Sequence, residues 1–556
     1  MERTFENHYI RNCRELGGSW RLTILSNQKE YTVQVPSCWE QEEELYSYVG
    51  KARYRKEFYL REQSSVKFVF KGVGHTADVY VDGVFLTHHY DSYTPFEGEI
   101  FQMAQGWHTL EIVADNSYSD QATLHKPNDY YSYGGIIRPV YLQVIHDVLI
   151  QSVHVTPIWE NGVWRGETKV VLKNLSNRCR TVSLQGKLHN TEMDFGSIIL
   201  EPKSQKTIVR DDIFDGVSNW NCQTPNLYQI SLVLFEEGRE VDDLIDRVGF
   251  RQIEIRDSFL YLNGEKLFLK GFNRHEDYGI VGSAVPLQLM EKDVSLILQT
   301  GANAVRTSHY PNDERFLDLC DEKGILVWEE AHARGLSEEQ MSLPLFVTQS
   351  KNSVCEMIGY HYNHPSIVIW GILNECASDT QYGKTVYQTL YHQMRKMDQS
   401  RLVTSASCQH LKDLCLGLPD IVSFNIYPQW YTKDTPKEFF DREYQWVQTT
   451  DGKGKPFILS EFGAGAIYGF REPGKCKWSE ERQAEILEEL LTEFLSRKEL
   501  SGVFIWQFAD CRVTEEEWWP TRPRSFNNKG IVNEYRQPKL AYETVKRLFQ
   551  QSITTD

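Results

Sequence analysis

The sequence predicts a multidomain β plus α/β fold, in which two β-sandwiches precede a (β/α)8 barrel of the TIM type. A chain of 556 residues is too long for one hydrophobic core, because single cores stop growing at about 250–300 residues. Short runs with alternating apolar and polar residues fill the first 255 positions, and apolar strands alternate with amphipathic helices after them. The change of period near residue 255 therefore predicts where the barrel begins.

Residues 1–145 are predicted to form a jelly-roll β-sandwich similar to sugar-binding domains. Runs such as "KFVFKGV" and "ADVYVDGVFL" alternate with period two between turn residues, and Asp82-Gly83 is a hairpin dipeptide. Residues 146–255 continue with "SVHVTPIW", "TKVVLKNL", "TVSLQGKL" and "YQISLVLF". Short strands at this spacing predict a second, immunoglobulin-like β-sandwich.

Residues 256–556 are predicted to form the catalytic barrel. The candidate strands are "LFLKGFNRH", "NAVRTSHY", "ILVWEEA", "SIVIWGILNE", "LVTSASC", "IVSFNIYP", "PFILSEFGA" and "SGVFIWQFAD". Amphipathic segments such as "EERQAEILEELLTEFLSRK" lie between them and predict crossover helices. An open doubly wound sheet is the alternative, but "FGAGAIYG" is not the GxGxxG loop of such folds. Eight strands favour the barrel.

Charge and hydropathy exclude several classes of partner. The net charge of −17 argues against nucleic acid, since phosphate binding requires Lys and Arg contacts. No apolar stretch approaches the ~20 residues that span a bilayer, so we expect no membrane partner. The N-terminal segment lacks a basic region followed by an apolar core, and the 11 cysteines contain no CxxC pair. These features favour a reducing, cytoplasmic location.

No cofactor or metal site is predicted. His361 and His364 have a spacing found in metal sites on helices, but Pro365 follows directly and ends the helix.

Polar and aromatic residues close the predicted barrel strands, and barrel enzymes carry their sites at these carboxyl ends. The residues at the strand ends are His275, Arg306, His309, Glu330, Asn374, Glu375, Asn425, Tyr427, Glu461, Trp506 and Asp510. Glu375 closes strand four and Glu461 closes strand seven, across the barrel from each other. Two facing carboxyl groups are the chemistry that glycoside hydrolysis requires, although a single Glu at a strand end is more often a salt-bridge partner.

Several motifs resemble the signature series of glycoside hydrolase family 2: "NRHEDYG", "RTSHYP", "NHPSIVIWGILNE", "FNIYPQWY", "ILSEFG" and "IWQFAD". The order of the three predicted domains is also similar to that family. The resemblance implies that Glu375 is the general acid/base and Glu461 the nucleophile of a retaining mechanism, with carboxyl groups about 5 Å apart. It further implies that Asn374 binds the sugar 2-hydroxyl and that Tyr427 hydrogen-bonds the nucleophile. We expect the charge of Glu461 to raise the pKa of Glu375.

The segment "RPRSFNNKG" follows the last strand, and Asn527 and Lys529 match the N-x-K pattern of the β-glucuronidases in that family. A lysine charge and an amide donor suit the carboxylate of a uronic acid. An arginine precedes this pattern in the family; Arg522 and Arg524 both fit, and Arg524 is preferred here. The other implied substrate contacts are Asp129, His309, Asn425, Tyr431 and Trp506.

The expected activity is therefore hydrolysis of β-D-glucuronides, with small-molecule or oligosaccharide aglycones. A β-galacturonidase is an alternative, and Arg334 is a candidate reader of the axial 4-hydroxyl. A β-galactosidase and a non-catalytic carbohydrate-binding protein are the remaining alternatives. The short segment "EEAHARGLSEEQMSLPLF" after strand three predicts an open site. The resemblance also implies a homo-oligomer, a dimer or tetramer, from a gut bacterium.

Overall fold

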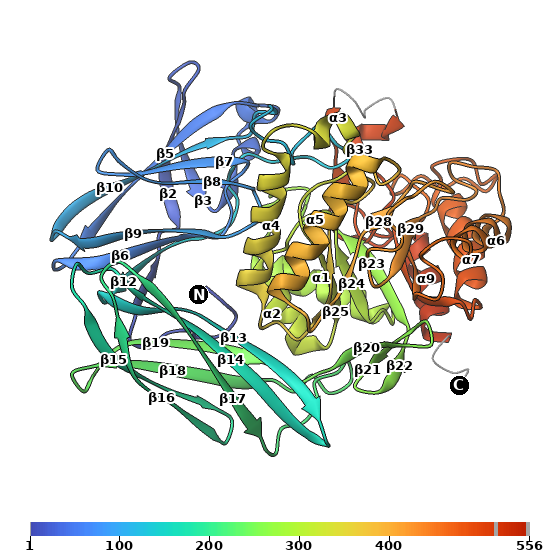
Figure 1. The fold of residues 1–556 in the computed structure, drawn as a ribbon. Helices are drawn as coiled ribbons and strands as arrows, with labels where there is room; N and C mark the ends of the chain where they lie inside the picture. Colours follow the sequence, from blue (N-terminus) through green and yellow to red (C-terminus); the bar gives the residue numbers. More distant parts are fainter. Residues whose placement is uncertain (1, 516–520, 552–556) are drawn as a thin grey trace.

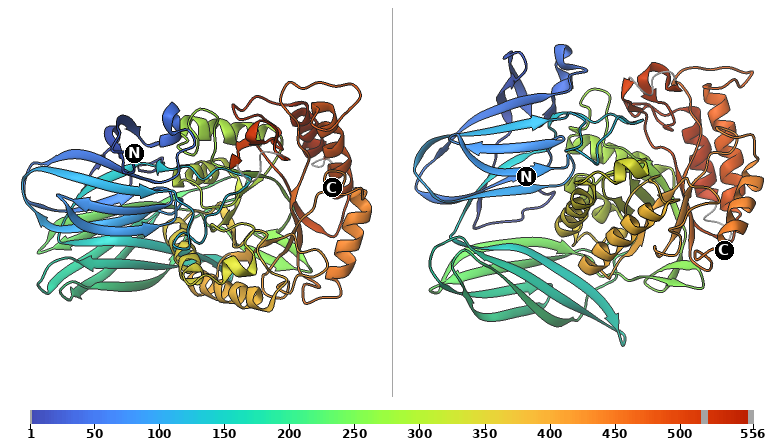
Figure 2. Two further views of the ribbon diagram at one scale, coloured as in Figure 1. Left: turned by 90° about the horizontal axis from the view of Figure 1, so that it is seen from above. Right: turned by 45° about the horizontal axis from the view of Figure 1, so that its top comes forward.

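The computed structural model describes residues 2–515 and 521–551, in which two β-sandwiches and a barrel follow one another. Figure 1 shows both sandwiches on the same side of the barrel, and the two further views in Figure 2 agree. The N-terminal segment lies between the three domains, where Arg3 contacts Asp246 of the second sandwich and Asp318 of the barrel. Across these described ranges, no helix is long and apolar enough to cross a membrane.

The first domain is a jelly roll of two antiparallel sheets. One sheet has the order β1 (Asn12–Glu15), β12 (Val140–Ile145), β6 (Ser64–Phe70) and β9 (Phe96–Met103). The other has the order β3 (Glu30–Val35), β2 (Gly18–Ile24), β5 (Lys51–Leu60), β10 (Gly106–Asp115), β7 (Thr76–Val81) and β8 (Val84–Tyr90). Asp82 and Gly83 have φ values of 51° and 77° between β7 and β8, so the predicted hairpin is confirmed.

The second domain is a seven-stranded antiparallel sandwich. Its sheets are β13 (Val148–Glu160), β14 (Val163–Asn174) and β17 (Gln205–Phe214), and β16 (Thr191–Leu200), β15 (Arg180–Leu188), β18 (Tyr228–Glu236) and β19 (Arg239–Val248). Alternate side chains of both sheets form one apolar core. A three-stranded antiparallel sheet of β20 (Ile253–Arg256), β21 (Phe259–Leu262) and β22 (Glu265–Leu267) then leads into the barrel.

The third domain is a closed parallel barrel, which confirms the predicted fold class. Seven of its strands are β23 (Leu269–Arg274), β24 (Ala304–Thr307), β25 (Leu326–Glu330), β26 (Ile367–Gly371), β29 (Val422–Asn425), β30 (Phe457–Phe462) and β31 (Leu500–Ile505). The remaining strand is split into β27 (Leu402–Thr404), which pairs with β26, and β28 (Ala406–Ser407), which pairs with β29. The barrel therefore closes through residues 402–407, and an open doubly wound sheet is excluded.

Helices surround the barrel, as the amphipathic segments predict. They are α1 (Leu287–Gln299), α2 (Glu314–Lys323), α3 (Glu338–Met341), α4 (Phe346–His361), α5 (Gln381–Met397), α6 (Pro436–Val447), α7 (Glu480–Leu495) and α9 (Leu540–Gln551). Local sequence sets their ends: Asp313 caps the start of α2, and Gly324 ends it in the left-handed conformation with φ 71°.

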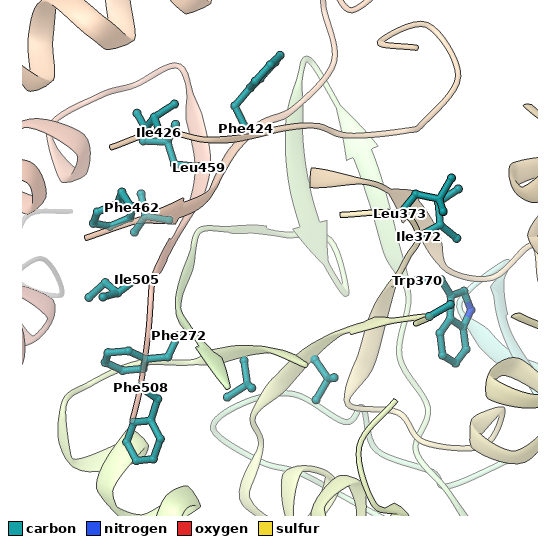
Figure 3. Close-up of a cluster of buried hydrophobic side chains, with 14 of the residues drawn as sticks. Phe272, Trp370, Ile372, Leu373, Phe424, Ile426, Leu459, Phe462, Ile505 and Phe508 are labelled. Carbon is teal, nitrogen blue, oxygen red and sulfur yellow. The ribbon is translucent and has the colours of Figure 1, made fainter. Parts of the chain in front are cut away.

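Apolar side chains fill the space between strands and helices and also close one end of the barrel. Figure 3 shows part of the outer cluster, in which Phe272, Leu459 and Ile505 come from the neighbouring strands β23, β30 and β31. A second apolar cluster joins the amino ends of the strands to Trp220 and to the three-stranded sheet β20–β22. The carboxyl end of the barrel is left for polar groups, and this arrangement positions the site.

Candidate active site

A cavity of about 520 Å³ opens at the carboxyl ends of the barrel strands. Most of the residues predicted for the site line it: Glu375, Glu461, Asn425, Tyr427, Tyr431, Trp506, Lys529 and Asp129. Three more predicted residues, Asn374, His309 and Asn527, hydrogen-bond to side chains in or around this cavity. Arg524 is not part of the cavity lining.

Glu375 follows β26 on a turn that aims its side chain into the cavity. Its φ of 54° is left-handed, and its backbone N–H donates to the carbonyl of Ala406 at 2.9 Å. Asn425 donates its amide Nδ2 to one carboxylate oxygen at 2.9 Å, and Arg334 lies 3.2 Å from the other. Arg334 and Asn425 together fix the orientation of the Glu375 carboxyl group.

Glu461 lies in β30 and is held by two donors. Arg306 donates to one carboxylate oxygen at 2.9 Å, and the Tyr427 hydroxyl donates to the other at 2.8 Å. Burial, and next the negative charge of Glu375, raise the pKa of Glu461 to about 8 despite these donors. The raised pKa that we expected for Glu375 stays a prediction.

Arg306 connects the polar groups below the cavity floor. The buried guanidinium donates to Glu330 at 2.7 Å, to Glu461, and to Oδ1 of Asn374 at 2.8 Å. Because the Asn374 oxygen also accepts from Asn425 at 3.1 Å, its Nδ2 is the end that remains for a ligand. This Nδ2 is buried and has no acceptor among the described residues.

His309 and His275 each present one ring nitrogen that has no partner in the described part of the chain. His309 contacts Glu330 through Nδ1 at 3.0 Å and stacks on Trp506 with ring centroids 5.0 Å apart. Burial holds the pKa of His309 far below its usual range, so the ring is neutral. With Nδ1–H donating to Glu330, Nε2 is an acceptor, and a sugar hydroxyl is a donor that suits it.

Lys529 is a buried cation of the cavity, which Arg334 and Arg522 also line. It is 2% exposed, and its ammonium lies 5.2 Å from the ring centre of Tyr431 and 5.7 Å from that of Tyr427. No carboxylate of the described residues forms an ion pair with it. Burial lowers the pKa of Lys529, although Tyr431 and Asp129 act against this effect. A buried ammonium without a carboxylate partner fits an anionic ligand.

Arg522, and not Arg524, accompanies Lys529. Arg522 is buried and donates to Asp129 at 3.1 Å and to the Tyr431 hydroxyl at 3.3 Å. Arg524 pairs instead with Glu534 at 3.2 Å and with Asn528 at 2.9 Å, and its side chain is 40% exposed. The backbone at Arg524 is left-handed, with a φ of 64°. The preference for Arg524 as the substrate contact is therefore corrected to Arg522.

Asp129 comes from a jelly-roll loop between β10 and β11 (Gly135–Ile136), so the first domain completes the cavity. Its carboxylate lies 3.2 Å from Arg334, and Asn527 donates to it at 3.2 Å. Tyr130 holds the same loop on the barrel through His332 at 3.2 Å. Because the Asn527 donor already contacts Asp129, its amide orders that carboxylate in the free site.

Sequence reasoning assigned no role to some residues of the cavity. Cys408, His410, Thr432 and Phe439 line it, and Arg334 was named only as an alternative reader. Cys408 directly follows the short strand β28, so the rule that sites lie after barrel strands could have found it. No sequence pattern pointed to His410, Thr432 or Phe439.

Two family descriptions match the chain from residue 148 to residue 553. Residues 253–553 match the family described as "Glycosyl hydrolases family 2, TIM barrel domain", and residues 148–251 match "Glycosyl hydrolases family 2". The crystal structure of a GH2 β-galacturonidase from Eisenbergiella tayi bound to galacturonate is similar with a TM-score of 0.96 and 46% identity, over 99% of each chain.

Two curated relatives are more distant. A β-glucuronidase from Paenibacillus borealis is 26% identical over 587 residues, which cover 96% of each chain. A putative β-glucuronidase from Formosa agariphila is 28% identical over 540 residues. That alignment takes in 89% of the present chain but only 63% of the Formosa protein.

Proposed function

The chain belongs to glycosyl hydrolase family 2 and is a glycoside hydrolase, and we propose that it is a retaining exo-β-uronidase. In this proposal Glu461 is the nucleophile, Glu375 is the general acid/base, and Lys529 binds the carboxylate of the terminal sugar. The observation that carries the uronide class is the buried ammonium of Lys529, which has no carboxylate partner among the described residues and lies in the same cavity as the two glutamates.

The proposed reaction has two displacements. Glu461 attacks the anomeric carbon while the bond to the aglycone oxygen breaks, and that oxygen takes the proton of Glu375. Glu375 then removes a proton from water, the water oxygen attacks the same carbon, and Glu461 is released. Arg306 and Tyr427 orient the nucleophile, and the free Nδ2 of Asn374 is positioned for the sugar 2-hydroxyl.

The reaction requires one proton shared by the two carboxyl groups. Burial, and next the charge of Glu375, raise the pKa of Glu461 to about 8, and Arg334 lies 3.2 Å from Glu375. For Glu461 to attack, this proton has to be on Glu375. The titration then belongs to the pair and not to either residue alone.

Between the two uronide epimers, we propose that β-galacturonides are preferred to β-glucuronides. Arg334 lies in the cavity between Asp129 and Glu375, both 3.2 Å away, where it can contact a sugar hydroxyl. The relative at 46% identity is a β-galacturonidase, and the β-glucuronidases above are 26% and 28% identical. This preference replaces β-glucuronide hydrolysis as the first candidate. Homo-oligomer formation, an open aglycone site and a cytoplasmic location remain predictions.

Kinetics of the unmodified protein on three p-nitrophenyl glycosides tests this function. We expect kcat/KM to be highest for the β-galacturonide, lower for the β-glucuronide and lowest for the β-galactoside. Faster turnover of the galactoside than of both uronides would remove the role proposed for Lys529. No turnover of any of the three would favour the alternative of a non-catalytic carbohydrate-binding protein.

Replacing the two arginines one at a time tests the assignment of Arg522. We expect Arg522→Met to raise KM for the uronide about 10-fold, the value of one hydrogen bond to a charged group. Arg524→Met removes the same charge outside the cavity and is expected to leave KM close to that of the unmodified protein. The measurement is steady-state kinetics of both variants, and a larger effect from Arg524→Met would reverse the assignment.

A further inference from the structure

A second cavity, of about 610 Å³, lies between the second sandwich and the barrel. Residues of β13 and β14, two strands that lie side by side (Figure 1), form one wall of the cavity. The segment Gln399–Ser400, which precedes β27, forms another. Segments that precede barrel strands lie at the amino end of the barrel, so this cavity is on the face opposite the catalytic one.

Arg251 lines this cavity and differs from the other buried arginines. Nine arginines are buried in the described ranges, and eight of them pair with a carboxylate, as Arg306 does with Glu330 and Arg401 with Asp398. Arg251 is 4% exposed and has no such pair. Taking a charge out of water is costly unless an opposite charge compensates it.

Two of the three guanidinium nitrogens of Arg251 have a structural role. Nε donates to the carbonyl of Pro365 at 3.1 Å, and Nη2 donates to the carbonyl of Ile367 at 2.7 Å. These bonds attach the end of the second sandwich to the segment before β26. Among the described residues Nη1 has no acceptor, so the structural role does not account for it.

The surroundings of Arg251 carry an excess of positive charge. Lys169 and Lys396 line the cavity with it, and Glu167 is the one acidic residue in the described lining. Burial, and next the charge of Arg401, lower the pKa of Arg251 to about 9, although Asp398, Tyr362 and Asp321 act against this effect. Burial also lowers the pKa of His154, so this ring adds no charge at neutral pH. The excess is notable in a chain whose net charge is −17.

We propose that this cavity binds a small oxyanion, held by Nη1 of Arg251 and by Lys396. Trp159 is 45% exposed at the rim and offers a flat surface for a sugar ring. Two kinds of ligand carry such an oxyanion: a uronic acid, through its carboxylate, and free phosphate. A planar guanidinium that exposes an N–H edge is suited to both.

The test measures binding of inorganic phosphate and of D-galacturonate to the full chain by isothermal titration calorimetry. Lys529→Met is the background, because it removes the cation that we propose binds a carboxylate in the catalytic cavity. We expect one anion per chain in this background, and at least 10-fold weaker binding when Lys396→Glu is added. Lys453→Glu, an equal change of charge at an exposed position outside the cavity, is the matched control.

Arg251→Met is expected to abolish binding; if it fails to fold, the Lys396→Glu and Lys453→Glu pair still decides the question. Tighter binding of galacturonate than of phosphate identifies the ligand as a sugar acid, and the reverse order identifies a phosphate. Absence of binding of both probes would overturn the proposal. Equal affinities in the Lys396→Glu and Lys453→Glu variants would overturn it as well.

Discussion

Glu461→Gln is expected to lower kcat for p-nitrophenyl β-galacturonide by roughly 10⁴-fold or more, since it removes the atom that would form the covalent bond. Glutamine has nearly the same shape and keeps one oxygen that can accept from Arg306 or Tyr427, so the fold should persist. The measurements are steady-state kinetics and the thermal unfolding midpoint. A rate within 10-fold of the unmodified protein would show that another group is the nucleophile.

Glu375→Gln is the matched control for this experiment, because it removes the second carboxyl group from the same cavity. The loss of kcat in Glu375→Gln should depend on the aglycone. It should be large for a poor leaving group that needs a proton, and much smaller for a leaving group that departs without one. Glu461→Gln should be equally impaired with both kinds of aglycone. Removing the charge of Glu375 should also lower the pKa of Glu461 from about 8, because that charge is the second cause of the shift.

The sequence predicts the two carboxyl groups of the proposed active site because parallel strands bring their carboxyl ends together. Glu375 and Glu461 are 86 positions apart, yet each comes at the end of an apolar strand, and barrel closure places both in one cavity. Lys529 was predicted from a short motif, and its burial beside Tyr431 agrees with a binding role. These predictions depend on strand order, on local pattern and on the resemblance to glycoside hydrolase family 2.

The residues that were missed depend on contacts between distant segments. Arg522 and Arg524 are equally basic, and the left-handed backbone at Arg524 decides which of them enters the cavity. Arg334 acquires its partners from the jelly-roll loop at Asp129, about 200 positions earlier in the chain. In the sequence Arg251 is an ordinary residue between two domains, and what distinguishes it is that no ion pair holds it within the described residues.

Lys529→Met should lower kcat/KM for uronides by roughly 10- to 100-fold, the range that corresponds to about 1.5–3 kcal/mol for one charge-assisted hydrogen bond. The loss should be at the upper end, because the substrate carboxylate would then enter a cavity that has no free cation among the described residues, while Arg522 remains paired with Asp129. Methionine keeps the length and the apolar stem of lysine, so packing against Tyr427 and Tyr431 should survive.

The neutral substrate p-nitrophenyl β-galactoside provides the internal control for Lys529→Met. It lacks the carboxylate, so its slow turnover should be unchanged or improved in the variant, and the ratio of uronide to galactoside kcat/KM should fall. Equal losses on both substrates would mean that Lys529 supports the cavity structurally and does not read the carboxylate. That outcome would leave Glu461 and Glu375 in their catalytic roles, because the chemistry at the anomeric carbon does not depend on the group that selects the sugar.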